Sequence, residues 1–410
     1  MGKKVKNEKN IISKIFNNGE TYNFKELFIV MIFSLCLGFI SCFSIFILFN
    51  GGRNYFSVNK DLNKFIDAYY AIVDNYYGDV DKNELLNNAI SAMANSVGDE
   101  FTVYSDSDAS LVFKETVDGI YEGIGCSIIQ NADNTISVME VFDDGPANEA
   151  GLKVGDVILN VNGKDIKEYD VSSLSQYIKT ESESKIVMKI LREGEEMTIT
   201  ITRGEVETPT VSSEVINSYN KKLGYISISI FSSVTAKQFD SHINKLLKEN
   251  IDGLIIDVRG NVGGYLTSVD EISKRILKKG DIIYQLEKNG KTEVFKDDTK
   301  ESLNIPIAIL VNSSSASASE ILASVIKESY NGYVVGTNTY GKGTVQQTLT
   351  LNDGSILKYT AQKWLTPNGN WINGVGVEPT NYVELSSNYI ENPIRENDNQ
   401  LQEAMSLLNN

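Results

Sequence analysis

The chain has 410 residues, of which 41% are hydrophobic, and its formal net charge is −16. This length exceeds an ordinary single domain, and the apolar content can fill more than one core, so two or three folded units are expected. The negative charge argues against a nucleic-acid partner, because phosphate binding requires a basic surface and the only basic cluster lies at the extreme N-terminus. Only Cys126 lies outside the apolar N-terminal stretch, so no internal disulfide is expected in the rest of the chain.

An apolar stretch without charged residues covers residues 27–49. At about 1.5 Å per residue it can cross a hydrocarbon core of about 30 Å, which predicts one transmembrane helix. Lysines outnumber acidic residues in the preceding basic tail, residues 1–26, and this predicts a cytoplasmic N-terminus with the rest of the chain outside. The predicted localisation is therefore the plasma membrane, with a single pass. A cleaved signal peptide is the alternative, but no small-x-small cleavage site follows the stretch.

The next segment, residues 60–115, is predicted to be mostly helical because apolar side chains recur at three- and four-residue steps. The recurring residues are Phe65, Tyr69, Ile72, Val73 and Tyr76, followed by Leu85, Leu86, Ile90 and Met93. Two amphipathic helices fit this pattern, and their apolar faces either pack on the body of the protein or form a dimerisation arm. The sequence leaves both interpretations open, so a homodimer is one expectation.

Residues 116–205 contain short β-patterned runs and are predicted to form a small β-rich domain. Gly123 and Gly125 flank Ile124 just before one run, and glycines there let backbone N–H groups turn toward a peptide carboxylate. The adjoining strand can then pair with an extended peptide, the C-terminus of another chain. A tight turn is the simpler interpretation of two glycines. However, the stretch 144–158 resembles a PDZ domain, and this resemblance implies peptide binding at Gly123, Ile124 and Gly125.

Residues 206–385 alternate strand-like and helical patterns, which predicts an α/β domain. The stretches 254–256 and 307–311 are continuous apolar runs, as expected for strands buried on both faces of a parallel sheet. Each run ends in turn-forming residues, and α/β folds place their reactive groups at such strand ends. Site residues are therefore expected at positions 260–264 and 312–319.

Three serines, Ser315, Ser317 and Ser319, alternate with alanines before a helical pattern, so they are expected at a helix N-terminus. The helix dipole and the free N–H groups there favour a developing oxyanion. Serines are also common helix caps, and Glu320 can complete a capping box, so the serines alone do not indicate a nucleophile. Lys342 lies between two glycines after a strand, and a lysine kept neutral by burial can act as the base for a serine. A solvated lysine is the commoner case.

From Asp99 onward the chain resembles the C-terminal processing peptidases, also called tail-specific proteases, which are serine enzymes with an embedded PDZ domain. Besides the PDZ stretch, the resemblance rests on residues 224–231, 257–264, 315–321, 341–347 and 366–379. It implies that Ser317 is the nucleophile, Lys342 the general base, and Gln346 the residue that orients the lysine.

The same resemblance places the oxyanion hole at two backbone N–H groups. These belong to Ala318 and Gly263, and Gly264 is the adjacent alternative. Neither a metal nor a cofactor is implied. The single histidine, His242, lies on a helical run where a surface position is expected, which argues against a His-dependent serine protease.

The predicted fold class is an α/β protease core with an inserted β-rich PDZ domain, an N-terminal helical segment and one N-terminal transmembrane helix. Residues 386–410 are expected to form a tail with a short closing helix. The predicted function is a membrane-anchored serine endopeptidase that binds the free C-terminal tails of extracytoplasmic proteins and cleaves through an acyl-enzyme. The alternative is a catalytically inactive, membrane-anchored PDZ scaffold that binds protein C-termini.

Overall fold

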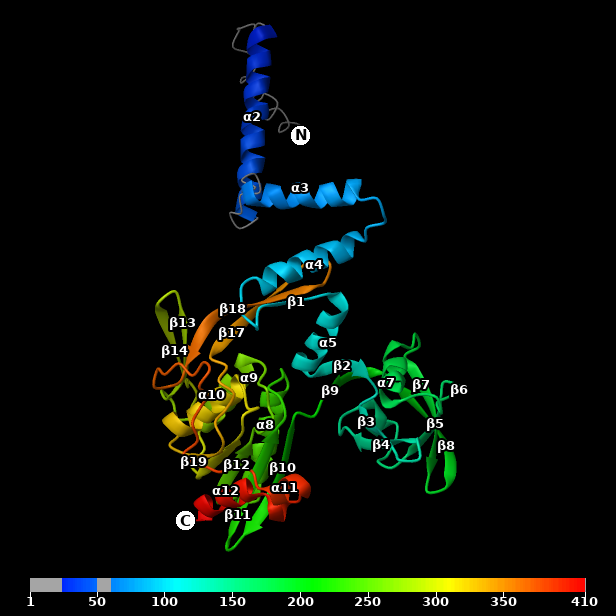
Figure 1. Ribbon diagram of the computed structural model, residues 1–410, viewed down its shortest axis with the longest axis vertical. Helices are drawn as coiled ribbons and strands as arrows, with labels where there is room; N and C mark the ends of the chain where they lie inside the picture. Colours follow the sequence, from blue (N-terminus) through cyan, green and yellow to red (C-terminus); the bar gives the residue numbers. More distant parts are fainter. Residues whose placement is uncertain (1–23, 50–59, 410) are drawn as a thin grey trace, which may run out of the picture. The chain divides into compact units, whose positions relative to one another are not determined.

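The computed structural model describes residues 24–49 and 60–409, and the chain divides into two units, Met1–Leu85 and Leu86–Asn410. Most of the predicted basic tail, residues 1–23, lies outside the described residues. The first unit contains the helices α2 (Phe24–Phe49) and α3 (Lys60–Asn75), and α4 (Lys82–Asn95) runs across the boundary between the units (Figure 1).

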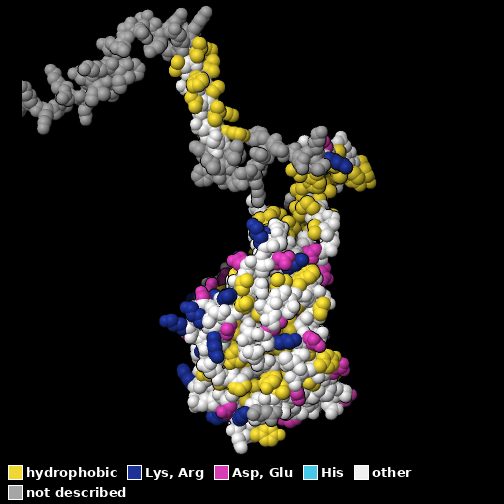
Figure 2. Space-filling view, turned by 90° about the vertical axis from the view of Figure 1, so that its left-hand side faces the viewer, with side chains coloured by type: hydrophobic (Ala, Val, Ile, Leu, Met, Phe, Trp, Pro, Cys, Tyr) yellow, Lys and Arg dark blue, Asp and Glu magenta, His cyan; other side chains and the backbone are white. Residues whose placement is uncertain are grey.

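Apolar side chains cover the part of α2 whose side chains are described, residues 28–44 (Figure 2). Among the described residues, however, no helix is both long enough and apolar enough to cross a membrane. The predicted transmembrane helix is therefore not confirmed and stays a prediction. On α3, Leu62, Phe65 and Ile66 are exposed.

The β-rich domain begins and ends at a pair of antiparallel strands, β2 (Ile120–Gly123) and β9 (Gly204–Glu207). Its antiparallel sheet has the order β3-β4-β5-β7-β8, with β6 beside β5. The bounds are β3 (Cys126–Gln130), β4 (Ile136–Val141), β5 (Val157–Val161), β6 (Lys164–Asp165), β7 (Lys185–Arg192) and β8 (Glu195–Thr202), with helices α6 (Pro146–Glu149) and α7 (Val171–Thr180). Alternate residues of β7, Ile186, Met188 and Ile190, are fully buried, as the two-residue period of a half-buried strand requires.

The α/β core is a six-stranded sheet with the order β10-β11-β12-β15-β16-β19, in which only β10 runs antiparallel to its neighbour. The strands are β10 (Val211–Ser218), β11 (Lys221–Ile228), β12 (Gly253–Asp257), β15 (Ile307–Val311), β16 (Tyr333–Gly336) and β19 (Asn381–Tyr382). Every residue of β12 and β15 is buried, which confirms that these apolar runs are central strands covered on both faces.

Helices cover both faces of this sheet. On one face Leu254 and Ile256 belong to a core with α8 (Thr235–Lys248), α9 (Leu266–Ile276), α10 (Ala318–Ser324) and the π-helical turn η1 (Val325–Ser329). On the other face Ile255 and Leu310 pack with Leu401 and Leu408 of α12 (Asn399–Asn409). The predicted closing helix is therefore present, and α11 (Ser387–Glu391) and the 3-10 turn η2 (Arg395–Asn397) precede it.

A second sheet lies beside the core and carries the segment after Lys342. Its strands are β1 (Val103–Ser105), β13 (Ile282–Lys288), β14 (Lys291–Lys296), β17 (Thr344–Thr350) and β18 (Ile356–Leu365), and α5 (Ser107–Asp118) follows β1. The long strand β18 pairs with β1 at its start, with β13 at its end and with β17 along its length. The segment before β1 and the segment before β17, which are far apart in sequence, therefore both lie next to β18.

Candidate active site

The two turns expected to hold site residues follow the neighbouring parallel strands β12 and β15. Hydrogen bonds join the turns directly, from Gly260 N–H to Asn312 Oδ1 (3.0 Å) and from Ala316 N–H to the carbonyl oxygen of Asn261 (3.0 Å). Asn261 is fully buried, and its side-chain amide donates to the Ile228 carbonyl oxygen (2.8 Å). The turns therefore form one rigid unit at the carboxyl ends of the strands, where α/β folds place their sites.

Among the three alternating serines, only Ser317 keeps a partly exposed side chain. The hydroxyl groups of Ser315 and Ser319 are fully buried and donate to the carbonyl oxygens of Val258 and Asn261, each at 2.8 Å. Ser317 has φ 55° and ψ −113°, a backbone conformation that costs energy for any residue other than glycine. Strained serines of this kind are found where a sharp turn presents a nucleophile at a helix start.

Gly263 lies directly against Ser317. A Cβ atom placed on Gly263 would lie 2.8 Å from Ser317 Cβ and 3.1 Å from Ala318 N, so a side chain has no room there. The N–H of Gly263 donates to Asn261 Oδ1 (2.9 Å). Within the described residues, the N–H groups of Ala318 and Gly264 donate to no acceptor. The structure thus brings Gly263 and Ala318 together at the Ser317 turn, with the Gly263 N–H already engaged, whereas Gly264 lies against the Phe231 backbone.

Glu320 connects the serine turn to the lysine loop. Its side chain is fully buried, and one carboxylate oxygen accepts the N–H groups of both Ser317 and Lys342, each at 2.8 Å. The other oxygen accepts the Thr339 hydroxyl (2.6 Å) and the Gly341 N–H (2.7 Å). The sequence predicted only a helix cap for Glu320, since its bonds to residues 339–342 depend on the folded chain.

Hydrogen bonds fix both backbone groups of Lys342. Its N–H donates to Glu320, and its carbonyl oxygen accepts the Trp364 indole N–H (2.7 Å). Its Nζ atom lies 4.4 Å from the centre of the Phe101 ring. No hydrogen bond joins Nζ to Ser317 Oγ in the described part of the chain. Burial lowers the pKa of Lys342, with a further contribution from Lys358. The predicted base is thus close to the serine turn in the fold but is directed toward an aromatic ring.

Gln346 lies on β17 and does not bond to Lys342 among the described residues. Its amide Nε2 donates to the Thr344 hydroxyl (3.0 Å) and to the Thr360 hydroxyl (3.2 Å). A β-bulge between Val345 and Gln346 interrupts the alternation of side chains that would have placed Lys342 and Gln346 on one face. This arrangement leaves Gln346 Oε1 to accept a hydrogen bond.

The predicted peptide-binding loop lies at the start of β3, an edge strand that pairs with β4 on one side and is unpaired on the other. Ile124 is buried, its carbonyl oxygen accepts the Ala147 N–H (2.6 Å), and the Gly125 carbonyl oxygen accepts the Phe142 N–H (3.0 Å). Gly125 has φ 78°, and a Cβ there would lie 3.1 Å from Gly145 Cα. An extended peptide can therefore pair with the open edge of β3.

The single histidine is not bonded to the serine turn in the described part of the chain. His242 pairs with Ser213 (2.7 Å) on β10 rather than with a serine of the 315–319 turn. Among the described residues, no group of three His, Cys, Asp or Glu side chains could hold a metal ion.

A PDZ-like domain, an α/β core and a strained serine tied to a partly buried lysine define a class of serine-type peptidases. Three family models match the chain: Peptidase family S41 over residues 222–383, PDZ domain over 123–202, and Activating protease CtpB N-terminal domain over 50–109. The chain belongs to the carboxy-terminal processing proteases of family S41, and the Ser/Lys dyad is characteristic of this family.

Among its relatives are two proteins of Bacillus subtilis. The carboxy-terminal processing protease CtpB is 37% identical over 340 residues, which cover 82% of this chain and 71% of the relative. The protease CtpA is 34% identical over 367 residues, 88% of this chain and 77% of the relative. A putative S41 protease from Bacteroides fragilis shares the fold, with a TM-score of 0.50 at 16% identity over 82% of this chain and 91% of that structure.

Proposed function

We propose that this peptidase cleaves with Ser317 as the nucleophile and Lys342 as the general base. One observation carries the proposal: the buried Glu320 carboxylate accepts the backbone N–H groups of both residues, which ties the serine turn to the lysine loop. The strained backbone and partly exposed side chain of Ser317 support its choice among the three serines. Burial lowers the pKa of Lys342, which is the direction that a lysine acting as a general base requires.

The reaction follows from these roles. The neutral Lys342 amine accepts the Ser317 hydroxyl proton while Oγ attacks the substrate carbonyl carbon. The C–N bond breaks, the leaving amine takes the proton from the Lys342 ammonium, and an acyl-enzyme remains. Water then attacks the ester and gives a proton to Lys342, which returns it to Ser317 Oγ as the new carboxyl terminus leaves. Because Nζ lies over Phe101, the amine has to turn toward Ser317 before the first transfer.

Gln346 and the backbone N–H groups complete the proposed site. Once the Lys342 amine has rotated away from Phe101, Gln346 Oε1 would accept a hydrogen bond from it and orient it. The Nε2 atom of Gln346 is held by two threonines. Ala318 N–H would stabilise the oxyanion, because it is free at the start of α10. The second donor would be Gly264 N–H, or Gly263 N–H once it is released from Asn261.

We further propose that substrates are proteins with free C-terminal tails, captured at Gly123, Ile124 and Gly125 along the open edge of β3. The names of the Bacillus subtilis relatives, which refer to carboxy-terminal processing, support this proposal. We also propose a plasma-membrane anchor at residues 27–49 that leaves the PDZ and protease domains extracytoplasmic, on the evidence of the uncharged run and the lysine-rich tail. The exposed apolar residues of α3 support a homodimer as a further proposal.

The catalytic proposal is tested with a substrate protein that ends in an unstructured apolar tail. Ser317→Ala and Lys342→Ala should each lower the cleavage rate by at least about a thousand-fold. Ser314→Ala, which removes an exposed hydroxyl from the same motif, serves as the matched control and should leave the rate unchanged. A serine-directed acylating probe should label the unmodified enzyme at Ser317. Tail binding without labelling would instead identify an inactive scaffold, and undiminished cleavage by either variant would contradict the assignment.

A further inference from the structure

Phe101 reaches the proposed base from a part of the chain that the catalytic motifs do not include. The segment before β1 is fixed to β18, because the Thr102 hydroxyl donates to Asp99 Oδ2 (2.6 Å) and accepts the Thr360 N–H (3.2 Å). Thr102 is buried, and Phe101 N–H donates to Asp99 Oδ1 (3.3 Å). This short turn therefore fixes the backbone on which the Phe101 side chain is carried.

The Phe101 ring meets Lys342 at its amine. Nζ lies 4.4 Å from the ring centre, within the range in which an aromatic face attracts a cation. The Lys342 backbone is already fixed by Glu320 and Trp364, so the ring contact decides where the flexible side chain places its charge.

We propose that Phe101 is a positioning residue for Lys342. The Phe101 ring holds the ammonium form of Lys342 on its aromatic face and keeps water away from the amine. This inference rests on the proposed role of Lys342 as the general base. The two effects of the ring oppose each other. The aromatic face favours the charged amine, whereas the exclusion of water favours the neutral amine that catalysis requires.

Besides the ring, four charged groups affect the pKa of the Lys342 amine. Burial lowers the pKa of Lys342 most, and Lys358 of β18 lowers it further. Asp99 and Glu100, from the segment before β1, and Glu320 of α10 raise the pKa. None of these groups is altered by substitutions at Phe101, so a change in the pH profile reports the ring itself.

The test compares two substitutions that separate the two effects. The pH dependence of kcat/KM reports the pKa of the base in the free enzyme, and activity rises with pH as Lys342 loses its proton. Phe101→Leu keeps an apolar cover but loses the aromatic face, so the midpoint of the acid limb should fall by about half a pH unit. Phe101→Ala admits water, so the midpoint should rise toward the ordinary lysine value. Phe101→Tyr restores the face and should restore the unmodified midpoint.

Phe295→Leu, the same substitution on β14 of the same sheet, is the matched control, because Phe295 stacks on Tyr284. It should lower stability without moving the acid limb, and thermal unfolding of every variant verifies that it is folded. The inference is overturned if Phe101→Leu and Phe101→Ala leave the midpoint unchanged, or if both move it in the same direction.

A second readout separates this inference from the proposed function. In the Ser317→Ala background, acetylation of Lys342 by acetic anhydride is followed against pH by mass spectrometry of its peptide. Midpoints that shift in opposite directions for Phe101→Leu and Phe101→Ala support the contact of Phe101 with the amine. If kcat/KM then shows no Lys342 limb, it is the proposed role of Lys342 as base that fails. Unshifted acetylation midpoints overturn the inference and leave the role of Lys342 as base intact.

Discussion

At the residue scale, one buried carboxylate organises the site. In the described part of the chain, the Glu320 carboxylate bonds to backbone N–H groups and one hydroxyl and to no cationic side chain. A carboxylate suits this position, since both oxygens act only as acceptors. The residue therefore fixes the main chain on either side of the proposed dyad while it takes no part in the proton transfers.

Glu320→Gln tests this arrangement. If the amide NH₂ faces Ser317 and Lys342, two N–H groups lose their acceptor, and if it faces Gly341 and Thr339, the Gly341 N–H loses its acceptor while the Thr339 hydroxyl can turn to accept. We expect the free energy of unfolding to fall by about 1–3 kcal/mol and the cleavage rate to fall to background. The measurements are urea unfolding and the tail-cleavage assay.

Glu328→Gln is the control, because the partly exposed Glu328 carboxylate accepts, among the described residues, only the Asn368 N–H (2.8 Å), which an amide oxygen can also accept. It should change stability by less than about 0.5 kcal/mol. Equal behaviour of the two glutamine variants would contradict the role assigned to Glu320.

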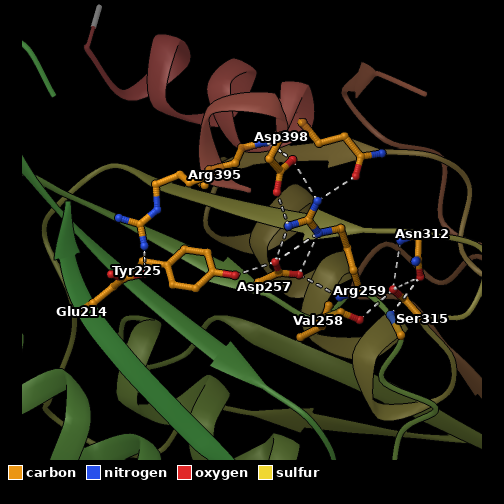
Figure 3. A network of polar contacts seen from close by, with 12 residues as sticks. Glu214, Tyr225, Asp257, Val258, Arg259, Asn312, Ser315, Arg395 and Asp398 are labelled. Carbon is orange, nitrogen blue, oxygen red and sulfur yellow. Dashed lines mark hydrogen bonds and ion pairs between the residues drawn. The ribbon is translucent and has the colours of Figure 1, made fainter. Parts of the chain in front are cut away.

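At the scale of elements, the C-terminal segment is tied to the turn that carries Gly263. Arg259 immediately precedes this turn, and its largely buried guanidinium group pairs with Asp257 (2.6 Å) and with Asp398 (2.8 Å), the residue before α12 (Figure 3). Gln400 Oε1 accepts a further hydrogen bond from Arg259 (3.0 Å), and the Tyr225 hydroxyl donates to Asp257 (2.7 Å). The last residues of the chain thus help to hold the strand end from which the site turn begins.

Asp398→Asn isolates the charge in this network. Asparagine can still accept the Leu401 N–H and cap α12, as Asp398 does at 3.0 Å. The loss of one partner from a buried ion pair should destabilise the protein by about 3 kcal/mol and should also reduce cleavage. Chemical unfolding and the cleavage assay measure the two effects.

Arg395→Gln is the matched control from the same segment. Arg395 pairs with Glu214 at the surface, where both side chains are 44% exposed (Figure 3). Exposed ion pairs contribute about 0–1 kcal/mol, so this variant should remain near the unmodified stability. If both variants lose the same stability, the buried network is not what secures the C-terminal segment.

At the scale of the whole molecule, the proposed membrane anchor determines where the protease acts. The full chain should sediment with membranes, resist extraction with alkaline carbonate and dissolve in detergent. A chain that starts at residue 50 should be soluble and should keep its cleavage activity, because the proposed catalytic residues all lie after residue 260. Cell fractionation and immunoblotting measure both.

Leu37→Arg supplies the control for this prediction. It places a charge in the middle of the uncharged run, at a cost of about 2.5–3.5 kcal/mol for insertion, and should shift part of the protein to the soluble fraction. Recovery of the full chain in the carbonate-soluble fraction would contradict a membrane-spanning anchor.

Much of the architecture could be predicted because it is encoded in local patterns. Runs of apolar residues identified β12 and β15, and turn residues at strand ends located the site turns. The PDZ and protease resemblances also rest on contiguous stretches. These features depend on residues that are neighbours in sequence, so their spacing alone carries the information.

The tertiary structure decided what spacing cannot express. Only the fold shows that Ser315 and Ser319 are buried and bonded while Ser317 is strained and partly exposed. Only the fold brings Phe101 onto Lys342, and only the fold places Asp398 beside Arg259. The sequence by itself determined the class of chemistry and its motifs. The environment of each site residue was decided by segments far away in the chain, because burial and hydrogen bonding depend on which distant strands and helices pack together.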